Sequence, residues 1–508
     1  MRLENTFVRD LPADPVLVNR PRQVHNACYT RVEPTPVAAP RLLAWSDDLG
    51  RRLGIERPSK TGPMTEVLGG NRLLPGMQPY AARYGGHQFG HWAGQLGDGR
   101  ALTLCEVIAA DGTRQEMQLK GAGRTPYSRS ADGRAVLRSS LREFMCSEAM
   151  HHLGVPTTRA LSLVATGEEV IRDMFYDGHP RPEPGAVVCR VAPSFVRFGN
   201  FQILAAQNEL AALQRLADYV MREHFPAQFS GPDSVAHWYR EVCRRTGLLM
   251  ADWMRLGFVH GVMNTDNLSI LGLTIDYGPY GWLEGYDLEW TPNTTDAEGR
   301  RYCYGNQPQV AHWNLTRLAE ALLLLVPDKT PLQEGLARYA QTFAHAWRKA
   351  LAQKLGVASL DRPGDDELVS ELFELLSAAE TDFTIFFRNL AAPTVESLHP
   401  AYYGEDIPRA RLEAWLQRYA ARLRQEELPD SERQVQMCAV NPKYVFRNYL
   451  AQQAIDALEQ NGNASMLERL MQVLKRPYHE QPEHQDLAAR RPEWARHKAG
   501  CSALSCSS

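Results

Sequence analysis

The sequence has no long hydrophobic run and few cysteines, and these absences exclude several classes of protein. The longest apolar run, residues 318–326, contains Glu320 and falls far short of the ~20 residues of a membrane span. Residues 1–12 carry mixed charges and no apolar signal core. The nine cysteines are scattered, apart from Cys501 and Cys506, so we expect neither a disulfide framework nor a zinc site. A reducing cytoplasm is the expected setting.

An excess of charge of one sign is also missing, because the formal net charge is -3. This balance gives no general electrostatic reason to bind nucleic acid or an anionic membrane, so any cationic site must be local. The hydrophobic fraction of 44% is ordinary for a globular protein. A chain of 508 residues is too long for one compact core, so we expect two or three structural units.

The composition and the hydrophobic pattern along the chain predict four regions. Residues 1–79 are rich in Pro and Arg and weakly periodic, which indicates an extended N-terminal arm laid over the body. Residues 80–199 carry short β-like runs and Gly-rich turns, residues 200–360 are mostly helical, and residues 361–508 form a helical extension with an irregular, cysteine-containing tail. The predicted strands are 101–108, 116–119, 161–165 and 186–191, and the predicted helices are 208–223, 234–256, 313–325, 332–355 and 366–379.

One further helix is expected within the sheet-rich region. Leu141, Phe144 and Leu153 recur there at helical spacing, with Ser139 or Ser140 as the predicted cap. A small sheet-rich lobe followed by a larger helical lobe predicts a two-lobed α/β (α+β) enzyme with its cleft between the lobes.

The segment from His260 to Gly278 carries the sharpest chemical pattern. It reads as a loop (HGVMNTDN, residues 260–267), a short apolar hairpin and an acidic turn that begins at Asp276. Kinase-fold enzymes need one carboxylate to position a hydroxyl, an Asn to hold a metal and a second Asp to bridge metal and phosphates. Such oxygen ligands suit Mg²⁺ or Mn²⁺. The alternative is that Asp266, Asn267 and Asp276 are ordinary turn residues.

Lys120 ends a β-like run that precedes the predicted helix around Phe144. The phosphate-binding lysine of kinase folds also lies on a strand upstream of a helix that carries acidic residues. The predicted helix offers Glu143 and Glu148 as ion-pair partners. The alternative is a surface lysine beside a turn. The glycines after Lys120 form no Walker motif, because the Gly-Lys-Ser/Thr ending is absent.

Several glycines and charged residues are candidates for binding phosphate groups. Tight glycine turns let the backbone approach an anion, and guanidinium groups bind its oxygens. The candidates are Gly97, Gly99, Arg100, Asp132, Gly133, Arg190 and Arg197. The alternative is that the arginines are ordinary surface charges. His87 and His91 have metal-compatible spacing, but no Glu follows His87, so we interpret both as structural.

Several segments together resemble the selenoprotein O family, known in bacteria as YdiU, and the likeness covers roughly residues 20–473. The resemblance implies a protein-kinase-like fold and an adenylyltransferase that moves AMP from ATP to Ser, Thr or Tyr of target proteins. Uridylyl transfer from UTP with manganese is also associated with bacterial members. The matching segments are 84–90 (YGGHQFG), 94–100 (GQLGDGR), 118–130 (QLKGAGRTPYSRS), 132–144, 190–199, 260–276, 306–308 with 313–314, and 441–449.

The resemblance also assigns roles to single residues. It makes Asp266 the proton acceptor, Asn267 and Asp276 metal ligands, and Glu143 the partner of Lys120, although the helical wheel places Glu148 nearer the apolar face. Nucleotide binding falls to Gly97, Gly99, Arg100, Lys120, Asp132, Gly133, Arg190, Arg197 and Asp276. In protein kinases the base lies five residues before the metal-binding Asn, where this chain has Val262, which cannot take a proton.

Two other functions stay open at this point, as does the role of the tail. A kinase-fold phosphotransferase is disfavoured by Val262, and a non-catalytic pseudokinase scaffold is disfavoured by the retained metal ligands and Lys120. The tail cysteine Cys506 matches the family's ending and implies a redox role. We hypothesise that it pairs with Cys303, against the alternative of a free tail thiol. A monomer is expected.

Overall fold

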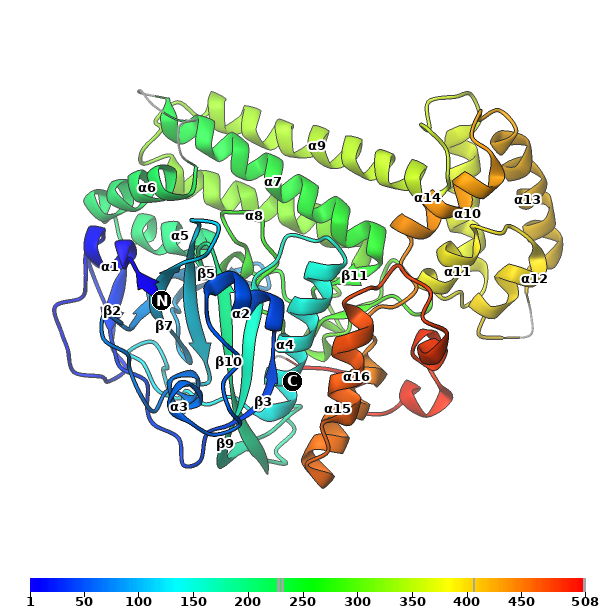
Figure 1. Ribbon diagram of the computed structural model, residues 1–508. Coiled ribbons are helices and arrows are strands. Elements are labelled where there is room, and N and C mark those ends of the chain that lie inside the picture. The colour runs from blue at the N-terminus through cyan, green and yellow to red at the C-terminus, as the bar shows by residue number, and fades with distance from the viewer. Residues whose placement is uncertain (226–228, 230–232, 405–406, 506–508) are drawn as a thin grey trace.

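The computed structural model describes residues 1–225, 229, 233–404 and 407–505 and places a sheet region before a helical region (Figure 1). Eight strands form one antiparallel sheet in the order β2-β4-β7-β8-β10-β9-β3, with β1 paired to β7. Two smaller pairs, β5–β6 and β11–β12, lie outside it. The strands are β1 Arg2–Leu3, β2 Tyr29–Arg31, β3 Arg41–Trp45, β4 Tyr80–Ala82, β5 Gly85–Gln88, β6 His91–Gln95, β7 Ala101–Ile108, β8 Arg114–Lys120, β9 Arg159–Arg172, β10 Arg181–Ala192, β11 Phe258–Val259 and β12 Gly281–Trp282.

The central strands are buried on both faces because core clusters lie on each side of the sheet. Val188 of β10 belongs to the cluster that contains Phe144 of α4, whereas its neighbour Val187 belongs to the cluster of Trp45. Successive residues of a strand point to opposite faces, so an apolar run is required here. The predicted strand 101–108 coincides with β7, and the other three predicted strands lie inside β8, β9 and β10.

The helices follow mostly after the sheet, and Figure 1 shows α5 to α9 above it and α10 to α14 grouped at one side. The predicted helix 234–256 coincides with α7, whereas α8 begins six residues before its predicted start. The helices are α1 Thr6–Asp10, α2 Asp47–Leu53, α3 Pro63–Gly69, α4 Leu137–His152, α5 Phe198–Ala206, α6 Leu210–His224, α7 Ser234–Leu256, α8 Gln307–Leu322, α9 Thr330–Lys354, α10 Asp365–Ala378, α11 Phe383–Asn389, α12 Val395–Leu398, α13 Arg409–Leu423, α14 Asp430–Val440, α15 Asn448–Asn461 and α16 Ser465–Leu474.

The start of α4 differs from the prediction. Its N-cap position is Val136, with no side-chain cap, and Ser139 Oγ instead donates back to the Val136 carbonyl at 3.1 Å. Val136 is held extended by a bridge to Gly185, so the helix can begin at Leu137 without a serine cap. The predicted cap at Ser139 or Ser140 is therefore wrong.

Three short strands from the first 79 residues, β1, β2 and β3, join the sheet. β2 and β3 occupy the two ends of the strand order, and β1 pairs with β7. The boundaries of the four predicted regions stay predictions. Across the described residues, no helix combines the length and the apolar character needed to cross a membrane.

Candidate active site

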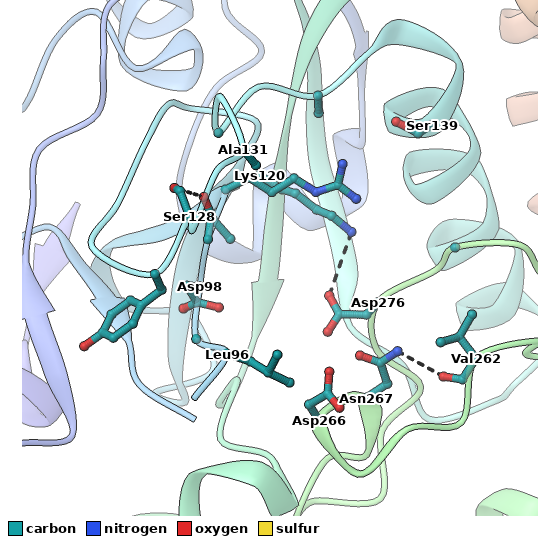
Figure 2. A pocket seen from close by; sticks show the side chains of 18 of the residues that line it. Leu96, Asp98, Lys120, Ser128, Ala131, Ser139, Val262, Asp266, Asn267 and Asp276 are labelled. Atoms are coloured by element: carbon teal, nitrogen blue, oxygen red, sulfur yellow. Dashed lines mark hydrogen bonds and ion pairs between the residues drawn. The ribbon is translucent and has the colours of Figure 1, made fainter. Parts of the chain in front are cut away.

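Strand β8 and helix α4 bring Lys120 and Glu143 together at the edge of a cavity. Lys120 Nζ lies 2.6 Å from Glu143 Oε2 and 3.8 Å from Asp276 Oδ1. Figure 2 shows the lysine reaching from the sheet toward Asp276, with Asp266 and Asn267 on the loop nearby. Residues that lie far apart in the sequence thus meet in one place, as the kinase-like pattern predicted.

Two buried arginines complete the charged cluster. Arg190 donates to Glu143 Oε1 at 2.9 Å and also to Asp276, while Arg197 donates to the other Asp276 oxygen and to the Asp266 carbonyl at 2.9 Å. Their side chains are 3% and 2% exposed. Three cations therefore surround two carboxylates, which leaves a local excess of positive charge that suits a polyanionic ligand.

The electrostatics of the cluster keep Asp276 ionised. Burial by itself would raise the pKa of this carboxyl, but Arg197, Arg190 and Lys120 together hold it well below its usual range. Glu143 behaves in the same way, because Lys120 and Arg190 outweigh its burial and lower its pKa. Both carboxylates are thus available as anionic ligands at neutral pH.

Asp266 lies on the loop between β11 and the acidic turn, in a different environment. Its Oδ2 accepts from Gln88 Nε2 at 3.2 Å, while its Oδ1 is buried and has no hydrogen-bond partner among the described residues. Burial raises the pKa of Asp266 to about 6. A carboxylate with a pKa near the working pH is well suited to accept a proton.

The loop that carries Asp266 is fixed by its neighbours. Asn267 Nδ2 donates to the Val262 carbonyl at 3.0 Å, and His260 Nε2 contacts the Ile275 carbonyl at 2.8 Å. From the other side, the β5–β6 hairpin docks on the loop through His87 N, which donates to Thr265 Oγ1 at 2.7 Å. These hydrogen bonds fix the position of the loop relative to β5 and the acidic turn, and α5 packs against it.

A cavity of about 580 Å³ opens over these groups, a size typical of small-molecule sites. Of all the predicted site residues, only Arg197 lies outside its lining, because its guanidinium is directed to Asp276 and stacks 4.5 Å from the centre of the Tyr84 ring. The predicted residues that line the cavity are Gly97, Gly99, Arg100, Lys120, Asp132, Gly133, Glu143, Arg190, Asp266, Asn267 and Asp276.

The glycine turns are required by close packing. A Cβ on Gly97 would lie 2.5 Å from the Tyr127 ring, and one on Gly133 would lie 2.2 Å from the Gly123 backbone, with both residues at positive φ. Asp132 is bound bidentately by Arg172, at 2.6 and 2.7 Å, so its carboxylate is already neutralised in the structure.

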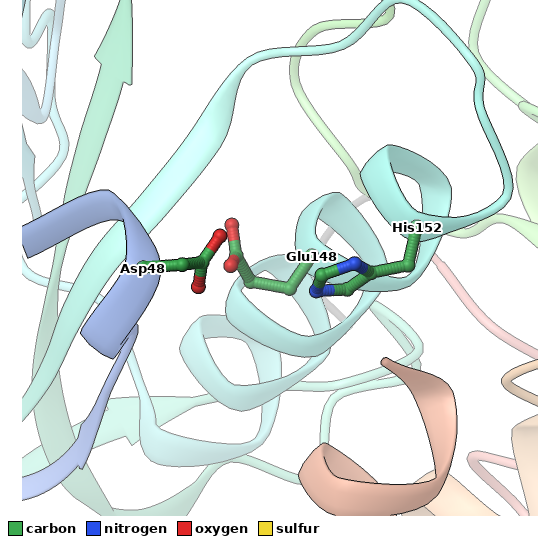
Figure 3. A group of neighbouring side chains, drawn as sticks. All are labelled: Asp48, Glu148 and His152. Atoms are coloured by element: carbon green, nitrogen blue, oxygen red, sulfur yellow. The ribbon is translucent and has the colours of Figure 1, made fainter. Parts of the chain in front are cut away.

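Glu148 belongs to a separate cluster toward the C-terminal end of α4. It lies beside Asp48 and His152 (Figure 3), and the three could together hold a metal ion. However, Arg159 Nε donates to Glu148 at 2.6 Å and its Nη2 donates to Asp48 at 2.8 Å, so a guanidinium already supplies the positive charge. The ion-pair partner of Lys120 is therefore Glu143 and not Glu148.

Sequence reasoning missed the residues that support the site. Arg142, next to Glu143, donates to the Tyr280 carbonyl at 3.0 Å and to Asn448 Oδ1 at 3.2 Å, and its own carbonyl accepts from Tyr280 Oη at 2.8 Å. Gln118 accepts a hydrogen bond from Arg190. Alternation along β8 could have indicated Gln118, which lies two residues before Lys120, but nothing in the sequence indicated the contact with Asn448.

The predicted tail disulfide falls partly outside the described residues, because Cys506 is not among them. Cys303 is buried, and burial raises the pKa of its thiol. Leu504, two residues before Cys506, contacts the segment after the acidic turn, since Thr294 N donates to the Leu504 carbonyl at 2.7 Å. The pairing of Cys303 with Cys506 stays a prediction.

Comparison with known proteins supplies the family. The model of the family described as protein adenylyltransferase SelO matches residues 17–475. The chain belongs to the SelO family. A protein nucleotidyltransferase YdiU of Nitrosospira multiformis is 63% identical, covering 100% of this chain and 96% of the relative. Similar proteins of the same description from Aromatoleum aromaticum and Azoarcus sp. are 56% and 57% identical, and each is covered over 99% of its length.

Membership of the SelO family places the chain among protein nucleotidyltransferases, enzymes that use a nucleotide and a protein as substrates. The geometry fits that class, because a cationic cavity for phosphates lies beside a buried carboxylate of raised pKa. Val262, at the usual kinase base position, contributes its carbonyl to Asn267 and has no side-chain proton acceptor.

Proposed function

We propose that this protein nucleotidyltransferase has a protein-kinase-like two-lobed fold and transfers AMP from ATP to Ser, Thr or Tyr hydroxyls of target proteins. We also propose UTP as a second donor and the cytoplasm as its location. The observation that carries the proposal is the placement of Asp266 and the Lys120–Glu143–Asp276 cluster on one cavity. A base shifted from the kinase position to the residue before Asn267 faces a different part of the nucleotide, which is consistent with attack at the α-phosphorus.

In this reaction the acceptor hydroxyl oxygen bonds to the α-phosphorus, the bond from that phosphorus to the bridging oxygen breaks, and pyrophosphate leaves. Asp266, whose pKa is raised to about 6 by burial, takes the hydroxyl proton. Lys120, Arg100 and Arg190 contact the phosphate oxygens from the cavity wall, and Glu143 holds Lys120 in place. Arg197 acts through Asp276 and holds its carboxylate.

Asn267 and Asp276 are the proposed ligands of Mg²⁺ or Mn²⁺. The donor set fits, because the Asn267 amide nitrogen is engaged with Val262 and leaves the amide oxygen for a cation, while Asp276 stays ionised. Each Asp276 oxygen has a second lone pair beyond those that accept from the arginines. When bound, the metal would neutralise charge on the phosphates.

The test is label transfer into protein. We would incubate the purified protein with Mg²⁺ or Mn²⁺ and with ATP labelled at the α- or the γ-phosphate, and with α-labelled UTP. Label from the α-phosphate alone, lost in Asp276→Ala, is the expected result. Label from the γ-phosphate alone would make the protein a phosphotransferase, and nucleotide binding without any transfer would leave a pseudokinase scaffold.

A further inference from the structure

We propose that a basic and aromatic surface beside Asp266 binds acidic residues of the protein substrate on either side of the acceptor hydroxyl. This surface, the Trp313 platform, consists of Trp92, Arg301, Trp313 and Arg317. The inference rests on the proposed function, since it names the substrate chemistry of the same site. It extends that function from the nucleotide to the second substrate, whose recognition the nucleotide cavity does not explain.

The platform is built by guanidinium groups stacked on an indole ring. The Cζ atoms of Arg301 and Arg317 lie 4.6 and 5.0 Å from the centre of the Trp313 ring. His87 connects it to Trp92, because its ring centre lies 5.5 Å from that of Trp313 and 5.0 Å from that of Trp92. A guanidinium stacked on an aromatic face keeps its N–H edges available for carboxylates.

The platform lies next to the loop that carries Asp266. Tyr302, the neighbour of Arg301, donates through its hydroxyl to Asn264 Oδ1 at 2.6 Å, and the adjoining hairpin reaches Asp266 through Gln88. Gly90 of the hairpin turn packs on Arg301, because a Cβ there would lie 3.5 Å from its Cζ. An extended peptide advances ~3.3 Å per residue, so side chains that flank the acceptor hydroxyl within a few residues are the ones that would reach the platform.

The charges of the platform favour an acidic partner. Arg301 forms no salt bridge with any carboxylate of the described residues, and nearby Asp296 is buried and accepts the backbone N–H groups of Arg301 and Tyr302. Among the residues that the structure describes, Arg317 forms a salt bridge only with Glu320, whose side chain is 48% exposed, and such a surface pair is weak.

The hydrophobic part of the platform is also accessible. Trp92 is 40% exposed at the hairpin edge and can cover an apolar or aromatic side chain of the same segment. The partner is therefore an extended, acidic stretch of protein around a Ser, Thr or Tyr.

The test uses three fluorescent peptides with one acceptor hydroxyl and with Glu, Ala or Lys at the flanking positions. Binding is followed by anisotropy and transfer by α-phosphate label, for the wild type and for Arg301→Gln with Arg317→Gln. Arg424→Gln is the matched control, because it removes an exposed charge at the end of α13, in the helical group remote from the sheet (Figure 1).

We expect the wild type to bind the Glu peptide at least about tenfold more tightly than the Lys peptide. The double variant should lose this preference while its affinity for ATP and for the Ala peptide stays unchanged, and Arg301→Lys should keep part of it. An unchanged preference in the double variant, or none in the wild type, would overturn the platform. Preferential binding without any α-label transfer would instead overturn the proposed function and leave the platform standing.

Discussion

Glu143→Gln is the substitution that best separates binding from catalysis at this site. The Glu143 side chain is 3% exposed and contacts Lys120 Nζ at 2.6 Å and Arg190 Nη1 at 2.9 Å. Glutamine keeps its size but removes the charge, so Lys120, Arg190 and Arg197 would face Asp276 alone. Removing one partner of a buried ion pair costs about 3 kcal/mol or more. We expect the free energy of unfolding to fall by this amount when no nucleotide is bound.

Nucleotide should reverse much of that loss, because its phosphates supply the missing negative charge. Ligand binding stabilises the folded state by mass action, so ATP should raise the stability of the variant more than that of the wild type. Transfer should nevertheless fall at least about tenfold, since Lys120 is no longer held in place. The measurements are urea unfolding followed by tryptophan fluorescence, with and without ATP, and α-phosphate label transfer.

Glu148→Gln is the control for this experiment, because Glu148 lies on the same helix and is bound to Arg159 away from the cavity. It should also lose stability, but ATP should restore none of the difference. The reasoning is refuted if Glu143→Gln is as stable as the wild type, if it binds ATP more weakly, or if both variants respond alike to ATP.

Three further substitutions test separate parts of the structure. Asp266→Asn should lower transfer by about 100-fold or more while ATP binding, measured by calorimetry, is retained, and undiminished transfer would exclude Asp266 as the base. Burial raises the pKa of Glu116 to about 8 from 4.5, so this residue destabilises the folded state as pH rises between these values. The free energy of unfolding of Glu116→Gln, measured with urea, should therefore exceed that of the wild type by up to about 4 kcal/mol at pH 8 and equal it at pH 4. A difference that does not change with pH would contradict this. Arg142→Lys should lower kcat and leave the KM for ATP unchanged in steady-state assays, because it loosens α4 and does not alter the phosphate contacts. A change in KM with unchanged kcat would contradict this.

The sequence predicted well those features that depend on neighbouring residues. An apolar β-like run between turn residues located β7 to the residue, and helical periodicity located α7 to the residue. It missed the start of α8, although Pro308 in the first turn was a readable signal. The order Asp266, Asn267, Asp276 along one loop likewise reflects local chain geometry, so their common location could be expected.

Features that depend on distant residues were harder to predict. The helical wheel placed Glu148 nearer the apolar face, whereas in the structure both Glu143 and Glu148 are at least nine-tenths buried on α4. The choice is made by the partner strands, since Lys120 lies on β8 and Arg159 on β9. Similarly, Arg197 was expected at the nucleotide, but its direction toward Asp276 depends on how α5 packs beside the loop.

The contact between Arg142 and Asn448 has a consequence for the order in which the protein matures. Their separation of 306 residues means that, during synthesis, the sheet and the catalytic loop leave the ribosome long before α15 does. Until then α4 lacks one of its anchors, and Glu143 is less firmly held against Lys120. A nascent chain with both halves of the cavity in place would thus be a poor enzyme, and nucleotide transfer would be delayed until the helices after residue 440 have folded onto α4.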